Sequence, residues 1–352
     1  MARGRMKRRI VGVLILLLSF GGGWVWMGYD LFLKQPINIE GEQLIYRVAP
    51  GATLKTVAFD LQRLGLLDHP RYFTWLARLR GANRVQVGEY ALEPDITPEQ
   101  FLDKISNGKV VQYALTIVEG WTFRQINAAL RQHGKILVTL TDAAESEIVK
   151  ALGLAEQHLE GLFLPDTYLF PADTTDVAFL KRAHAALNMH LQNEWATRAG
   201  NLPYKTPYDA LIMASIVEKE TGAPSERPEI AGVFVGRLTK GMRLQTDPTV
   251  IYGMGDLYQG NIRRKDLQTD TPYNTYTRKG LPPTPIASPS LAALQAALHP
   301  NSGGYLYFVA KGDGTHYFSK TNEEHAKAVR LYQLKRAADY HSNPTTPTDQ
   351  TK

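Results

Sequence analysis

The chain has 352 residues, 44% of them hydrophobic and 21% charged, which is an ordinary globular composition with room for two modest domains. It contains no cysteine, so disulfides, thiolate-bound zinc and cysteine nucleophiles are excluded. The formal net charge of +6 comes largely from five basic residues before the first long apolar segment: Arg3, Arg5, Lys7, Arg8 and Arg9. Because nucleic-acid binding needs a basic patch on the folded domain, the charge does not indicate a nucleic-acid partner.

The first long apolar segment covers residues 10–28, IVGVLILLLSFGGGWVWMG, and carries no charge. At about 1.5 Å per residue it can cross a hydrocarbon layer roughly 30 Å thick, and Trp24, Trp26 and Tyr29 lie at its end, where aromatic rings favour the membrane interface. A cleaved signal peptide is the alternative, but bulky aromatics stand where small residues would precede a cleavage site. The segment therefore predicts a retained single-pass transmembrane helix. The positive-inside rule then places residues 1–9 in the cytoplasm and the rest in the bacterial periplasm or cell-wall space.

After this anchor, residues 29–43 show no helical period and are expected to form a stalk. Residues 44–108 follow the order strand, helix, helix, strand, and end in a helix over 97–108 that has a Thr-Pro start and a glycine stop. This unit resembles a LysM-like module, a glycan-binding fold. A purely structural αβ module that positions its neighbour is the alternative.

Residues 109–340 are expected to form a mixed α/β domain, so that the whole chain falls in the α+β class. The domain begins with a strand and a helix over 110–134, followed by a proline-bearing, aromatic loop over 159–173 and a long amphipathic helix over 177–199. Near its end, two alternating aromatic strands flank a Gly-Asp-Gly turn, and a capped helix follows from Thr321. Residues 341–352 are polar and proline-bearing and are expected to be disordered.

The helix over 206–222, TPYDALIMASIVEKETG, starts with a capping box formed by Thr206 and Asp209 around Pro207. Its apolar residues occur nearly all round, which predicts that protein encloses it. Two acids stand at its far end, Glu218 and Glu220.

Helical phase separates these two acids. Glu218 falls on the face of Leu211 and Ala214, whereas Glu220 is rotated by about 200° from it. A carboxyl on an enclosed face loses hydration, which disfavours its charged form and suits a general acid. A buried ion pair with Lys219 or a distant arginine is the structural alternative.

Two later segments combine hydroxyls, amides and aromatic rings with prolines, namely RLQTDPTVIYG (243–253) and TPYNTY (271–276). Saccharides offer hydroxyls for hydrogen bonding and apolar faces for aromatic rings, so these segments are candidates for a sugar site. A structured surface loop is the alternative.

Three histidines raise the question of a metal: His299, His316 and His325. None has the spacing of a known metal motif, so we predict no metal site and no cofactor. His325 lies on the capped helix, where solvent exposure is expected, while His316 in the hairpin is a candidate for substrate binding.

Several motifs, in order along the chain, resemble the endolytic murein transglycosylases of the MltG (YceG-like) type: EGLFLPDTY, MASIVEKET, LQTDPTVIYG, TPYNTY, GLPPTPIASPS and FVAKGDGTHYFSKTNEEH. The resemblance extends from about Ile10 to Tyr332. It implies that Glu218 is the catalytic acid/base and that Glu220 supports the site. Candidates for sugar binding are Gln245, Asp247, Tyr252, Asn274 and His316.

The resemblance also implies the reaction. The enzyme would cleave the β-1,4 bond between N-acetylmuramic acid and N-acetylglucosamine in nascent glycan strands, leave 1,6-anhydro-muramic acid ends, and terminate elongation beside penicillin-binding protein synthases. One carboxyl suffices when the sugar's C6 hydroxyl is the nucleophile, whereas ordinary hydrolysis uses two. Asp247 could be that second carboxylate, so a hydrolytic muramidase or glucosaminidase is one alternative. A non-enzymatic, membrane-tethered glycan-binding scaffold is another.

Overall fold

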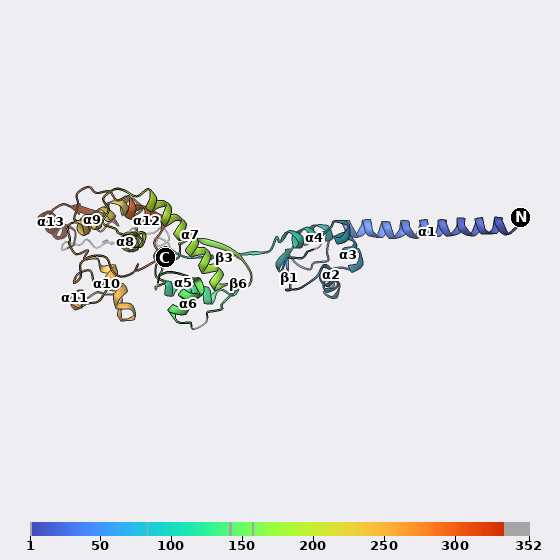
Figure 1. The fold of residues 1–352 in the computed structure, drawn as a ribbon, viewed down its shortest axis with the longest axis horizontal. Coiled ribbons are helices and arrows are strands. Elements are labelled where there is room, and N and C mark those ends of the chain that lie inside the picture. Colours follow the sequence, from blue (N-terminus) through green and yellow to red (C-terminus); the bar gives the residue numbers. More distant parts are fainter. Residues whose placement is uncertain (1, 83, 141–142, 157, 334–352) are drawn as a thin grey trace. The chain divides into compact units, whose positions relative to one another are not determined.

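The computed structural model describes residues 2–82, 84–140, 143–156 and 158–333, so the tail expected over 341–352 lies outside the described residues. The chain divides into two compact units, one of residues 1–113 with 170–172 and the other of residues 114–169 with 173–352 (Figure 1). Both units combine helices with short strands, which confirms the mixed helix and sheet architecture.

The first unit contains α1 (Ala2–Lys34), β1 (Leu44–Val48), α2 (Leu54–Arg63), α3 (Pro70–Leu79), β2 (Gly88–Leu92) and α4 (Pro98–Asn107). Strands β1 and β2 pair antiparallel, with Leu44 opposite Leu92. The predicted order of strand, helix, helix and strand is therefore confirmed. The likeness to a LysM module stays a prediction.

Helix α1 does not end where the apolar segment ends. It continues to Lys34, and Tyr29 and Phe32 pack their rings against Tyr72 of α3. Ile37 is 2% exposed and donates its backbone N–H to the Ile96 carbonyl at 2.8 Å. The expectation of a stalk over 29–43 was wrong for residues 29–37. The apolar side chains of Tyr29, Phe32 and Ile37 join the core of the first unit. Residues 10–34 remain long and apolar enough to span a membrane, and an 18-residue stretch within them has a mean hydropathy of 2.1.

The second unit carries the remaining elements: β3 (Gln112–Thr116), α5 (Phe123–Gln132), β4 (Ile136–Leu137), α6 (Glu145–Leu152), β5 (Thr167–Pro171), β6 (Thr174–Thr175), α7 (Asp176–Ala196), α8 (Pro207–Glu220), η1 (Pro224–Glu226), α9 (Arg227–Thr239), α10 (Asp247–Met254), η2 (Gly255–Leu257), α11 (Arg264–Gln268), α12 (Leu291–Leu298), β7 (Tyr307–Ala310), β8 (His316–Ser319) and α13 (Asn322–Tyr332). Strand β3 pairs with β5, and β4 pairs with β6.

Two expected elements near the C-terminus are confirmed. Strands β7 and β8 form the antiparallel hairpin, and Thr321 with Glu324 forms the capping box of α13. The expected loop over 159–173 instead contains strand β5, in which Tyr168 and Phe170 point inward while their neighbours are exposed. This alternation is typical of a strand with one buried face.

Helix α8 is the centre of the second unit. Every residue from 210 to 217 is buried, and the helix packs against α7, α9 and α12 (Figure 1). Thr206 and Asp209 form its predicted capping box. The polar Ser215 is satisfied because its hydroxyl accepts the backbone N–H of Ile286 at 3.0 Å. The sequence-based expectation of an enclosed helix is confirmed, and its last turn carries both acids.

Helix α9 is approached closely by the segment after α12. A Cβ added to Gly232 would lie 2.0 Å from the backbone oxygen of Asn301, whereas one added to Gly236 would meet a flexible leucine side chain at 3.3 Å. The Asn301 N–H is meanwhile bound to the Pro228 carbonyl at 2.9 Å, so the segment cannot easily move away.

We expect Gly232→Ala to lower the free energy of unfolding by about 2 kcal/mol, because the clash with backbone exceeds the helix preference for alanine. Gly236→Ala on the same helix is the matched control and should change stability by less than about 1 kcal/mol. Thermal unfolding of the detergent-solubilised chain measures both. Equal effects of the two substitutions would contradict this reading.

Candidate active site

Both oxygens of the Glu218 carboxylate accept hydrogen bonds from neighbouring groups. Oε2 accepts from the backbone N–H of Ser290 at 3.0 Å and from its hydroxyl at 2.5 Å, and Oε1 accepts from Arg227 at 3.3 Å. The Glu218 and Arg227 side chains are 6% and 9% exposed. Ser290 is also the N-cap of α12. Glu218 therefore ties the end of α8 to the starts of α9 and α12, as the buried ion-pair alternative describes.

Glu220 lies in a different environment, on the wall of a cavity of about 580 Å³. Burial is the main cause that raises the pKa of its carboxyl to about 7. The hydrogen bond from the Thr246 hydroxyl lowers the pKa, the nearby charge of Asp247 raises it, and Arg237 lowers it. The Thr246 hydroxyl donates to Oε1. A carboxyl with a pKa near 7 exchanges protons at neutral pH, which is the property of a general acid/base.

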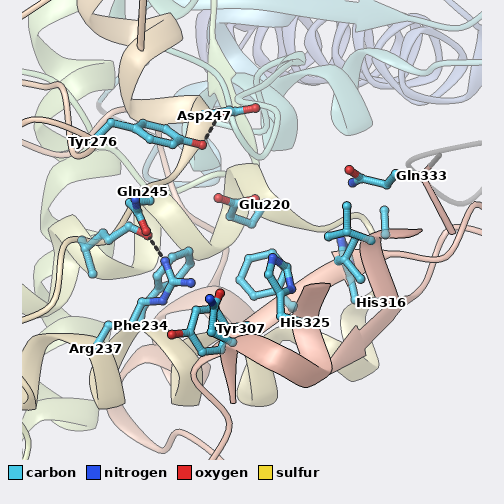
Figure 2. Close-up of a pocket in the computed structure, with 16 residues that line it drawn as sticks. Glu220, Phe234, Arg237, Gln245, Asp247, Tyr276, Tyr307, His316, His325 and Gln333 are labelled. Carbon is cyan, nitrogen blue, oxygen red and sulfur yellow. Dashed lines mark hydrogen bonds between the residues drawn. The ribbon is translucent and has the colours of Figure 1, made fainter. Parts of the chain in front are cut away.

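The cavity around Glu220 is polar and aromatic, and its walls come from α8, α9, α10, β7, β8 and α13. Figure 2 shows Glu220 between Asp247 and Tyr276 on one side and Tyr307 and His325 on the other. The cavity thus brings together four of the residues expected from the sequence: Glu220, Gln245, Asp247 and His316. Glu218 is not among the residues that line it.

The segment before α10 is held rigidly. Thr246 donates its backbone N–H to the Thr275 hydroxyl at 3.1 Å, and the Asp247 carboxylate accepts from the Tyr276 hydroxyl at 2.6 Å. Gln245 has φ of 52°, a left-handed conformation that costs a non-glycine residue of order 1 kcal/mol. The surrounding hydrogen bonds maintain this conformation, which places Gln245 and Asp247 together on the cavity wall.

Arg237, Tyr307 and His325 also line the cavity, and the sequence did not single them out as site residues. Arg237 donates to the carbonyls of Leu306 and Leu244, both at 2.6 Å, and its guanidinium lies 5.2 Å from the Tyr307 ring centre. His325 stacks on Tyr307 instead of facing solvent as expected, and its Nδ1 has no hydrogen-bond partner in the described part of the chain. These residues are up to about 90 positions apart, so no local motif could indicate that they meet.

Two expected sugar-binding residues lie away from this cavity. Asn274 is 1% exposed, and its amide donates to three backbone carbonyls and accepts from the Tyr276 N–H, so it shapes the loop and has no free group for a ligand. Tyr252 lines a second cavity of about 840 Å³ and donates to Glu160 at 3.1 Å. Burial raises the pKa of Glu160 to about 7 as well.

His316 lies on the wall of the first cavity, but its imidazole is engaged. Its Nδ1 is 2.7 Å from the Glu226 carboxylate, which also accepts the His316 backbone N–H at 2.9 Å. Only Nε2 remains for a ligand. The Glu226 contact orients the ring, so His316 is suited to hold a substrate hydroxyl in one position.

The two acids of α8 should respond oppositely to conversion into glutamine. The folded Glu220 carboxyl has a pKa of about 7 against an unfolded value near 4.5, so its contribution to stability is complete below the unfolded value and is lost as pH rises through the folded value. Glu220→Gln should therefore raise the thermal midpoint near pH 8, and the gain should shrink towards pH 5.

Glu218→Gln is the matched control. It removes the charge that pairs with Arg227 and should lower stability by about 2 kcal/mol near neutral pH. Thermal unfolding across this pH range tests both variants. A Glu220→Gln effect that does not change with pH would contradict the environment described for Glu220.

Comparisons with known proteins identify the family of the chain. A family model described as the YceG-like family matches residues 46–331. A Bacillus subtilis protein named endolytic murein transglycosylase is 30% identical over 334 residues, covering 90% of this chain and 91% of the relative. A Streptococcus pneumoniae protein of the same name is also 30% identical, and the match covers 90% of this chain and 63% of the relative. The crystal structure of a YceG-like protein from Listeria monocytogenes, 30% identical, aligns with a TM-score of 0.51 and covers 81% of this chain and 98% of that one. The motifs, the fold and these matches together establish that the chain belongs to the YceG-like family.

Proposed function

We propose that this protein is a membrane-anchored endolytic lytic transglycosylase that cleaves the β-1,4 bond between N-acetylmuramic acid and N-acetylglucosamine in nascent peptidoglycan strands. The observation that carries the proposal is Glu220, a carboxyl with a pKa of about 7 on the wall of a polar and aromatic cavity. The name endolytic murein transglycosylase of two relatives supports the same reaction class.

Glu220, and not Glu218, is the acid/base in this proposal. Both oxygens of Glu218 are bound by Ser290 and Arg227, so a proton transfer there would first break a buried ion pair. Glu220 has only the Thr246 hydroxyl as a side-chain hydrogen-bond partner among the described residues, and it lines the space where a sugar fits. Glu218 then has a positioning role, holding the end of α8 against α9 and α12. The motif resemblance implied that Glu218 is the acid/base and that Glu220 supports the site, and the proposal exchanges these two roles.

The reaction needs one carboxyl. Protonated Glu220 donates its proton to the glycosidic oxygen as the bond from the anomeric carbon of the muramic acid breaks. The carboxylate then takes the proton of the same sugar's C6 hydroxyl, whose oxygen bonds to the anomeric carbon. The product is a 1,6-anhydro-muramic acid end, no water is consumed, and Glu220 is protonated again for the next cycle.

Neighbouring groups have distinct tasks in this scheme. Burial, with a smaller contribution from the Asp247 charge, keeps the pKa of Glu220 high, which favours the protonated form that starts the reaction. Gln245 and His316 offer hydrogen bonds to sugar hydroxyls. Tyr252, in the second cavity, is placed to contact a more distant part of the strand.

Helix α1 anchors the chain in a bacterial inner membrane, with its basic N-terminus in the cytoplasm and the part of the chain after about Asp30 in the periplasm. The first unit acts as a LysM-like glycan-binding module. Cleavage close to the membrane terminates strand elongation beside penicillin-binding protein synthases.

The product mass tests the reaction. Digestion of purified peptidoglycan with the detergent-solubilised chain should release fragments one water lighter than hydrolytic products. Fragments with hydrated reducing ends would establish a hydrolase instead, and binding without any cleavage would establish a scaffold.

Glu220→Gln should lower the rate of cleavage by at least about 100-fold while strand binding is retained, because the proton donor is lost. Glu218→Gln should retain far more activity at a temperature where it is folded. Mass spectrometry of timed digests compares them. The reverse ranking would return the catalytic role to Glu218.

The rate should fall as pH rises through about 7, because the starting form of Glu220 is protonated. Asp247→Asn removes a charge that raises the pKa of Glu220. The pH at which the rate falls should therefore be lower in this variant, while activity at acidic pH persists. Complete loss of activity at every pH would instead mark Asp247 as a second catalytic carboxylate, as the hydrolytic alternative requires.

A further inference from the structure

An apolar groove of about 710 Å³ runs between α1 and α3 in the first unit. Its walls include Leu18, Val25 and Trp26 of α1 and Trp75, Arg78 and Leu79 of α3. Trp26, Trp75 and Leu79 are 70%, 46% and 75% exposed. Large apolar side chains from two helices thus form one continuous surface that the described part of the chain leaves uncovered, which is typical of a contact with an apolar partner.

The groove is continuous with the segment that crosses the membrane. Tyr72 of α3 packs edge-on against Tyr29 and Phe32 of α1, with ring centres 5.9 and 5.7 Å apart, and Trp75 lies 6.0 Å from Tyr72. Since Tyr29 and Phe32 are buried in the core of this unit, the position of α3 along α1 is set by side-chain packing.

The length of α1 gives the depth of α3. The apolar segment over 10–28 ends at Gly28, and the groove reaches Leu18, ten residues deeper along the helix. Ten residues of helix correspond to about 15 Å, which is half of a hydrocarbon layer roughly 30 Å thick. The end of α3 therefore lies at the level of the outer leaflet when residues 10–28 span the membrane.

The charge of α3 also suits contact with the outer leaflet of a membrane. The helix has two basic residues, Arg71 and Arg78, and no acidic one. Arg78 lines the groove beside the exposed Leu79, where its long side chain can extend towards the headgroups while its methylene groups remain on apolar surface. Lipid phosphates are the anions at that level.

We propose that α3 is a second membrane contact, which inserts Trp75 and Leu79 into the outer leaflet so that a phospholipid acyl chain occupies the groove and Arg78 faces its phosphate. The inference rests on the proposed membrane anchor and is independent of the catalytic assignment. Its consequence is that the first unit is fixed on the membrane surface instead of moving freely on a stalk.

Site-specific fluorescence in liposomes tests the contact with the full-length chain. Because the chain has no cysteine, Leu79→Cys, Leu16→Cys and Ile45→Cys each provide one site for an environment-sensitive label. Ile45 is the matched control, because it is an exposed apolar residue, 44% exposed, on β1 at the end of the unit far from α1 (Figure 1). Leu16, in the middle of α1, reports insertion of the anchor. Phospholipids with a nitroxide on the acyl chain quench labels that reach the hydrocarbon.

We expect quenching at Leu16 and at Leu79, with the Leu79 label quenched at least about twofold more than the Ile45 label. Quenching at Leu16 with equal, low quenching at Leu79 and Ile45 would overturn the proposal and leave the anchor intact. Equal, strong quenching at Leu79 and Ile45 would also overturn it, because the contact would not belong to α3. No quenching at any site would overturn both the anchor and the contact. Retained peptidoglycan cleavage by each labelled chain shows that it is folded.

Discussion

The loss of water around the last turn of α8 is the constraint on which the candidate site depends. Residues 210 to 217 are buried on every side by α7, α9 and α12, so the two acids that follow cannot both remain charged and hydrated. Each is accommodated differently. Glu218 accepts hydrogen bonds from Arg227 and from Ser290, the N-cap of α12, while Glu220 has a raised pKa at the edge of a cavity. Low polarity around a carboxyl is costly in a structural residue and useful in a proton donor.

These two solutions depend on each other. The Glu218 contacts hold the end of α8 against the starts of two helices, and this fixes the direction in which Glu220 leaves the helix. On the opposite wall, the Asp247 and Tyr276 pair and the strained Gln245 backbone hold α10 in place. The cavity is therefore built from rigid elements before any substrate arrives, which lowers the cost of binding and orienting a sugar.

In the first unit, apolar side chains impose a comparable constraint on a helix that is long and apolar enough to span a membrane. Tyr29 and Phe32 make the end of α1 part of the folded core of this unit. An exposed apolar surface on α3 lies beside the same helix, and this is why we propose that both contact a bilayer.

Much of this organisation could be predicted from local patterns in the sequence. The apolar segment, the capping boxes at Thr206 and Thr321, the C-terminal hairpin and the enclosed character of α8 all follow from periodicity and caps, which act over a few residues. Helical phase also showed that Glu218 and Glu220 face different surroundings. The choice between them could not be made from the sequence, because it depends on which groups arrive from elsewhere. Ser290 lies 72 positions after Glu218, and Thr246 lies 26 positions after Glu220. The same holds for Asn274, whose amide is used by its own loop, and for Arg237 and Tyr307, which meet only when β7 packs near α9. The sequence by itself determined which segments are buried and where the acids stand. Only the tertiary structure decided which acid is paired and which lines the cavity, since charge partners and solvent access are properties of the packed chain.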